Sequence, residues 1–266
     1  VLLPGLVKRD FPDKAALMTG LYTMTMCAGA AGASGLTLPI EHALGGSFSA
    51  ALAIWALPAL VVSLLWLPQV VMSRGQVRRA AVRVEGLWRD RLAWHVTLFM
   101  GLQSALAYCV FGWMVPILRE RGLDGVTAGA VVSVSIMVQA AACLVAPHLA
   151  VRGRDQRLIN AALCVVAVVA LIGMLFAPLW SVWFWAVLQG IGQGGLIAVA
   201  LTVIVLRSPE PIVAAHLSGM AQCVGYLLAA IGPFVVGLIR GWTGSFAWNA
   251  ALFVLLGLGA AANGVF

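Results

Sequence analysis

The residues of this chain that are best suited to chemistry are neutral amides and hydroxyls within long apolar runs. Gln189 and Gln193 are four residues apart, so they share one face of a helix. Ser218, Gln222 and Tyr226 repeat this spacing further along the chain. Such groups either hydrogen-bond a small polar solute or bond neighbouring helices to one another. The candidates for contact with a solute are Gln103, Tyr108, Gln189, Gln193, Gln222 and Tyr226.

Ionisable groups are predicted outside the apolar interior. All nine acids and all four histidines fall in loops or near the ends of the apolar runs. Catalysis within a membrane needs an acid, a base or a metal ligand at depth. The sequence therefore predicts no catalytic residue, no metal site and no cofactor, and it disfavours an enzyme. The five cysteines all lie within apolar runs, which indicates packing residues and not a disulfide framework.

The elements that must position these side chains are membrane helices. The chain of 266 residues is 62% hydrophobic and 9% charged, which excludes an ordinary soluble domain. Continuous apolar runs of about 20 residues match the hydrocarbon core when they form helices, whereas a barrel would need alternation. The sequence predicts an all-α, polytopic membrane helical bundle. The eight predicted spans are 15–39, 47–72, 93–118, 125–150, 158–178, 179–206, 214–239 and 247–266.

The cations predict the orientation of these spans, because Lys and Arg accumulate in cytoplasmic loops. Three of the 16 cations lie on one side: Arg119, Arg121 and Arg240. The other 13 lie on the side that we assign to the cytoplasm: Lys8, Arg9, Lys14, Arg74, Arg78, Arg79, Arg83, Arg89, Arg91, Arg152, Arg154, Arg157 and Arg207. The net charge of +7 thus resides in short loops beside the lipid bilayer, and no nucleic-acid partner is predicted.

An internal repeat predicts the larger organisation. VKRDFPDKAALMTG from Val7 aligns with LRSPEPIVAAHLSG from Leu206 at an offset of 199 residues. Both copies enter a helix from the cytoplasmic side, as in a parallel repeat of two transporter halves. Twelve spans are then expected, with about 105 residues before Val1 by the same offset. This chain carries the end of span 4 and spans 5–12, divided into 1–72 of the first half, a linker at 73–92 and the second half at 93–266.

The linker has two interpretations. Its apolar residues recur at helical spacing among arginines, which is typical of a helix on the anionic cytoplasmic leaflet. Alternatively, its arginines serve only to orient the neighbouring spans.

Several stretches resemble one family. LLPGLVKRDFPDKAALMTGLY, LQSALAYCVFGWMVPIL, LQGIGQGG and LRSPEPIVAAHLSGMAQCVGYLLAAIGPFVVGLI are similar to the cyanate permease and nitroimidazole transporter branch of the major facilitator superfamily. The resemblance implies that spans 7 and 10 line a central cavity, with Gln103, Tyr108, Gln189 and Gln193, while span 11 flanks it, with Gln222 and Tyr226. A cavity that is half lined by amides and hydroxyls suits a small monovalent anion or a polar heterocycle as substrate. We expect a monomeric permease in the bacterial inner membrane, with protons as one candidate for the coupling ion.

The chain departs from the superfamily pattern after the predicted span 8. The motif there begins with an acid, whereas this chain reads VRGRDQR, with Asp155 displaced. Arg154, Asp155 and Arg157 are gating candidates, and the alternative is a solvated basic turn. The alternatives to a transporter are a channel subunit, a non-transporting scaffold and a membrane-embedded enzyme.

Overall fold

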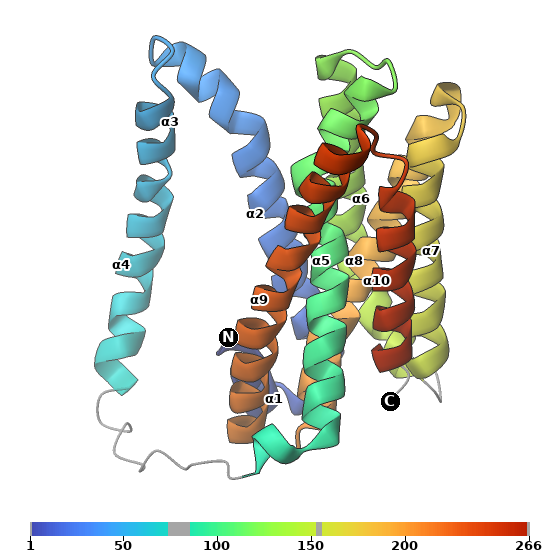
Figure 1. Ribbon diagram of the computed structural model, residues 1–266. Coiled ribbons are helices and arrows are strands. Elements are labelled where there is room, and N and C mark those ends of the chain that lie inside the picture. The colour runs from blue at the N-terminus through green and yellow to red at the C-terminus, as the bar shows by residue number, and fades with distance from the viewer. Residues whose placement is uncertain (1, 74–85, 153–155, 265–266) are drawn as a thin grey trace. The chain divides into compact units, whose positions relative to one another are not determined.

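The computed structural model describes residues 2–73, 86–152 and 156–264, and these form helices and no strands (Figure 1). The all-α prediction is confirmed, and helices occupy each of the eight predicted runs. The helices are α1 (Leu3–Asp10), α2 (Ala15–Ala43), α3 (Phe48–Ile54), α4 (Ala56–Ser73), α5 (Arg91–Glu120), α6 (Gly125–Arg152), α7 (Gln156–Phe176), α8 (Val182–Arg207), α9 (Pro211–Thr243) and α10 (Asn249–Gly264). Short 3-10 turns lie at Pro12–Lys14, Leu87–Arg89 and Leu179–Ser181.

Six helical segments among the described residues are long and apolar enough to cross a membrane: Phe48–Pro68, Arg91–Glu120, Gly125–Ala150, Arg157–Phe176, Leu179–Arg207 and Pro211–Thr243. Asn249–Gly264 is a shorter apolar helix. The first of the six contains one irregularity, because α3 ends at Ile54 and α4 begins at Ala56. The 47–72 run is therefore two helices separated by Trp55.

The chain divides into two compact units, residues 1–28 with 84–266, and residues 29–83. The predicted division into 1–72, 73–92 and 93–266 stays a prediction. Most of the proposed linker lies outside the described residues, since 74–85 are not described. In the smaller unit, the Trp55 indole donates to the Thr37 hydroxyl at 3.1 Å, which connects α2 to the junction between α3 and α4.

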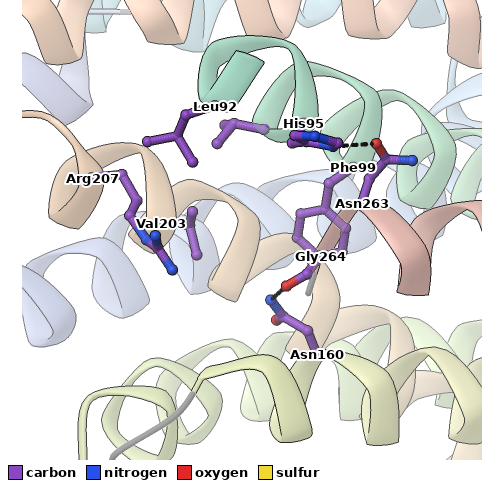
Figure 2. Close-up of a pocket in the computed structure, with 9 residues that line it drawn as sticks. Leu92, His95, Phe99, Asn160, Val203, Arg207, Asn263 and Gly264 are labelled. Atoms are coloured by element: carbon purple, nitrogen blue, oxygen red, sulfur yellow. Dashed lines mark hydrogen bonds between the residues drawn. The ribbon is translucent and has the colours of Figure 1, made fainter. Parts of the chain in front are cut away.

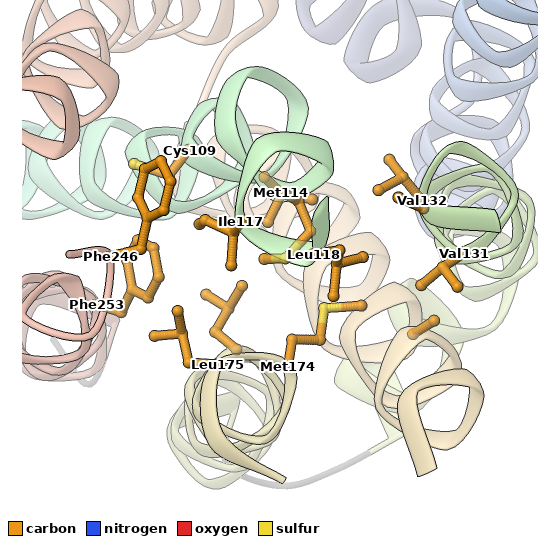
Figure 3. Packing of buried hydrophobic residues seen from close by; sticks show 14 of the residues in the cluster. Cys109, Met114, Ile117, Leu118, Val131, Val132, Met174, Leu175, Phe246 and Phe253 are labelled. Atoms are coloured by element: carbon orange, nitrogen blue, oxygen red, sulfur yellow. The ribbon is translucent and has the colours of Figure 1, made fainter. Parts of the chain in front are cut away.

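The larger unit has two main apolar clusters along α5. The cluster near the C-terminal end of α5 joins it to α6, α7, α9 and α10, through residues such as Met114, Ile117, Met174 and Phe253 (Figure 3). The second cluster surrounds Met100 and Leu196 and joins the N-terminal half of α5 to α7, α8 and α9. These clusters make α5 and α8 the most buried of the described spans.

Glycines let the backbones of this unit approach closely. Gly190 and Gly194 face α6, while Gly192 and Gly195 face α7. The glycines of α8 therefore allow close packing against two neighbouring helices. A Cβ atom added at Gly192 would lie 2.7 Å from the backbone nitrogen of Ala167. The positions of the α8 amides are consequently fixed by direct backbone contact with both neighbouring helices.

Candidate functional site

Gln103 and Gln193 meet at the crossing of α5 and α8. The Gln193 amide nitrogen donates to the Gln103 backbone oxygen at 3.0 Å and lies 3.2 Å from the Gln103 Oε1. The Gln103 amide nitrogen donates to the Ser104 hydroxyl at 2.8 Å. Gln103 is 0% exposed and Gln193 is 1% exposed, and the buried Gln193 Oε1 has no hydrogen-bond partner among the described residues. This buried Oε1 therefore has an acceptor capacity that no described residue uses.

Gln189 lies one turn before Gln193 and contacts α6 instead of α5. The Ser135 hydroxyl donates to the Gln189 Oε1, and Gln189 is 1% exposed. Ser135 and Gln139, which the sequence also places on one helix face, are both buried. The two α8 amides thus bond two different helices, α5 and α6.

The candidate residues of α9 are more exposed than the glutamines of α5 and α8. Gln222 donates to the Ser218 hydroxyl at 2.8 Å and is half-buried, as is Tyr226. The Tyr226 ring lies 6.2 Å from the Tyr108 ring on α5, centroid to centroid, with an interplanar angle of 58°. Tyr108 is 37% exposed. Five of the six candidates therefore form a buried amide group and a partly exposed tyrosine pair, and the sixth, Gln222, is half-buried one turn before Tyr226.

The gating candidates are placed only in part. Arg154 and Asp155 lie outside the described residues, and Arg157 is exposed near the start of α7. The gating role of all three stays a prediction.

A small cavity of about 20 Å³ lies elsewhere, between α5, α7, α8 and α10 (Figure 2). His95 is hydrogen-bonded to Asn263 at 2.9 Å, and Asn160 donates to the Gly264 oxygen at 2.8 Å. A volume of this size holds about one water molecule. None of the six candidates lines this cavity.

Acids in the described residues lie at helix ends, and several are paired. Glu120 forms a 2.8 Å ion pair with Arg240, which also lies 5.1 Å above the Phe246 ring. Asp124 caps α6 by accepting from the Thr127 amide at 2.9 Å, and the hydrogen bonds from Thr127 lower the pKa of this carboxyl. The ion pair was not predicted, because its partners are distant in sequence and no local spacing connects them.

Arg121 is a further residue that the sequence did not single out. Its guanidinium donates to the Met174 oxygen at 2.5 Å and to the Ala177 oxygen, at the C-terminal end of α7. Burial lowers the pKa of this guanidinium, which still stays protonated in proteins. Arg121 thus satisfies helix-end carbonyls that have no partner within their own helix.

Arg121→Ala should destabilise the protein without removing a candidate site residue. Hydrogen bonds from a charged donor contribute about 1.5–3 kcal/mol, so the melting temperature should fall by about 3–8 °C. Differential scanning fluorimetry of the detergent-purified full-length protein measures this change. Arg119→Ala is the matched control, because Arg119 is exposed on the same helix end. Equal melting temperatures for the two variants would contradict the capping role.

Comparison with known proteins gives relatives along nearly the whole chain. No family model matches the chain. It is 39% identical over 267 residues to the transporter YycB of Bacillus subtilis, which covers 99% of this chain and 66% of the relative. It is 39% identical over 254 residues to the 2-nitroimidazole transporter of Escherichia coli, which covers 95% of this chain and 64% of the relative. It is 26% identical over 262 residues to the cyanate transport protein CynX of Escherichia coli, which covers 97% of this chain and 67% of the relative. The chain spans about two thirds of the length of these curated relatives.

Proposed function

The chain is homologous to the cyanate and 2-nitroimidazole transporters, a branch of the major facilitator superfamily, and from this premise we propose that the full-length protein is a secondary transporter of a small polar solute or monovalent anion. The observation that carries the proposal is the 39% identity to two transporters along at least 95% of the chain. A membrane helical bundle with neutral polar groups in its interior supports the same function.

Transport in this proposal proceeds by alternating access. One half contributes α1 to α4, and the other contributes α5 to α10. Gly5 of α1 approaches Ala215 of α9, and the start of α2 packs near Val205 of α8, both at the predicted cytoplasmic ends. These contacts close the cytoplasmic side of the solute path. Separation of the two halves at these contacts then opens the path toward the cytoplasm.

The site in this proposal combines Gln103, Gln189 and Gln193 with Tyr108, Gln222 and Tyr226. The amide oxygens and amide nitrogens of the first group hydrogen-bond a solute near the midplane, in place of some of the bonds that they make to Ser135 and to one another. No chemical conversion of the solute is proposed. The protein is a monomer of the bacterial inner membrane, coupled to protons.

Uptake assays test this function directly. The full-length gene product, reconstituted into liposomes, should accumulate radiolabelled 2-nitroimidazole or cyanate when a proton gradient is imposed. A protonophore should abolish accumulation above equilibrium if protons drive it. A correctly inserted and monodisperse protein that carries neither solute under any gradient would contradict the proposal.

Gln193→Ala is expected to lower the initial rate of uptake about tenfold, since loss of a buried hydrogen-bonded group costs about 1–3 kcal/mol. The physical reason is the loss of both the donor to Gln103 and the unpartnered Oε1. Thr202→Ala is the matched control on α8, because this buried hydroxyl only bonds its own helix at Ala198. Transport and the amount of protein in the membrane are measured together. Unchanged uptake in the Gln189→Ala, Gln193→Ala double variant would remove α8 from the site.

A further inference from the structure

Two thiols meet where α2 packs against α6. The Cys27 and Cys143 sulfur atoms lie 3.8 Å apart, although 116 residues separate them in the chain. Gly20 permits this close packing, because an added Cβ atom there would lie 2.9 Å from the Cys143 backbone oxygen. The sequence indicates separate packing cysteines, whereas the structure brings two of them together as a dithiol pair.

The dithiol pair is enclosed by apolar side chains. Cys27 is 7% exposed, Cys143 is 0% exposed, and neither forms a disulfide. The Cys143 thiol donates to the Gly194 backbone oxygen on α8 at 3.4 Å. The other residues of this small cluster are Met24, Ala140, Ile197 and Ala198. In such an environment, a bound ion is stable only if its own ligands neutralise its charge.

The number and type of ligands determine which metal ion fits the pair. Thiolate ligands select soft metal ions. A structural zinc ion takes four ligands, but the described residues hold no group of three or more His, Cys, Asp or Glu side chains that could bind a metal. Two metal–sulfur bonds of about 2.3 Å each span at most about 4.6 Å, so a two-coordinate ion needs the sulfurs to separate by less than about 1 Å.

Charge narrows the choice further. Two thiolates carry two negative charges and neutralise a divalent ion, whereas a monovalent copper or silver ion would leave one negative charge among apolar side chains. Mercury(II) is a soft divalent ion that prefers two sulfur ligands in a line. Its dichloride is neutral and crosses lipid, so it can reach Cys27, the more exposed of the two thiols.

We propose that Cys27 and Cys143 form a binding site for a soft, two-coordinate divalent metal ion of the mercury(II) type, and that the bound ion stops transport. Each thiol releases one proton to water, two sulfur–mercury bonds form, two chloride ions leave, and no electron is transferred. The product is a neutral bridge from α2 to α6. The block rests on the proposed transport function, because it requires the two halves to separate at this contact.

Retention of mercury(II) by the purified full-length protein tests the site. The second thiol acts within the same molecule at an effective concentration of about 1 mM or more, so a monothiol at about 10 µM should remove the ion from lone cysteines and not from the pair. After this wash, elemental analysis should find one mercury ion per wild-type chain, and at least about tenfold less in Cys27→Ser or Cys143→Ser. Cys223→Ser removes an exposed thiol and should retain the ion. Equal retention by wild-type protein and both pair variants would overturn the site.

Intact-mass measurement of the washed wild-type protein needs no variant. A bridge between the two thiols adds the mass of one mercury atom less two protons. An ion held by one cysteine keeps a molecule of the monothiol as its second ligand, so this additional mass would overturn the bridge.

Uptake of 2-nitroimidazole by the full-length protein in liposomes tests the block. One equivalent of mercuric chloride should lower the initial rate of the wild-type protein more than about tenfold, and dithiothreitol should restore it. Cys27→Ser and Cys143→Ser should resist the metal. Retained mercury with unchanged uptake would overturn the block. Metal-free wild-type protein that carries neither 2-nitroimidazole nor cyanate would overturn the transport function, while the retention measurement still decides the binding site.

Discussion

A membrane-permeable azodicarboxamide should join Cys27 to Cys143 in the full-length protein and thereby stop uptake almost completely. The two sulfur atoms lie 3.8 Å apart across the contact between α2 and α6, and both thiols are free and buried. A disulfide needs a separation of about 2.05 Å, so an approach of less than about 2 Å suffices. The two thiols lose two protons and two electrons to the azo group, which is reduced to the hydrazine. The reaction should be slow, because only the thiolate attacks and both thiols are buried.

The inhibition follows from the position of this bond. Cys27 lies on the first proposed half and Cys143 on the second, so a covalent bond prevents their separation. If the two halves move apart in every transport cycle, the oxidised protein completes no cycle and uptake falls more than about tenfold. Dithiothreitol should restore uptake. The fraction of cross-linked protein is measured by the loss of sites for a polyethylene-glycol maleimide after denaturation.

Serine variants identify the thiols that are responsible. Cys27→Ser and Cys143→Ser should each transport normally and resist the oxidant, whereas Cys223→Ser should remain sensitive. Cys223 is exposed on α9 and is therefore the suitable control. Complete cross-linking with unchanged uptake would show that α2 and α6 keep their contact during transport. The proposed separation of the two halves would then be wrong at the contact between α2 and α6.

Most of the fold could be predicted because the helices are specified locally. A run of apolar residues must be helical in lipid, where every backbone group needs a partner within its segment. Prolines do not disturb this rule, since Pro116 and Pro233 lie within helices that continue past them. Pro58 is the exception, because it has no amide to donate to the Ile54 carbonyl four residues before it, and the helix breaks at that point, at Trp55. The Trp55 indole bonds Thr37, and this contact lies outside any local pattern.

For the candidate site, the sequence predicts which residues share a helix face, but it does not predict which residues of other helices they bond. The four-residue spacing correctly places Gln189 and Gln193 on the same side of α8. It does not reveal that one amide bonds Ser135 and the other Gln103, because spacing within a helix says nothing of its neighbours. The same limit applies to Arg121, whose acceptors lie on another helix.

Gly194→Val should prevent the larger unit from folding correctly and should abolish uptake. A Cβ atom at position 194 would lie 2.8 Å from the Gln139 Cα atom on α6, closer than real Cβ atoms approach. The obstacle is backbone, so no side-chain rotation relieves it, and the two helices must separate. Such overpacking costs about 1–3 kcal/mol or more. Separation also breaks the bond between Ser135 and Gln189.

Gly129→Val on α6 is the matched control for this prediction, since an added Cβ atom meets nothing within 4 Å there. Fluorescence-detected size-exclusion chromatography should give a monodisperse peak for this control and an aggregated or absent peak for Gly194→Val. Because the same side chain is added to a membrane helix in both variants, hydrophobicity cannot account for a difference between them. Wild-type elution and melting temperature in Gly194→Val would mean that α6 and α8 are not in backbone contact at Gly194. The amides of α8 would then no longer be fixed by the packing on which the proposed site depends.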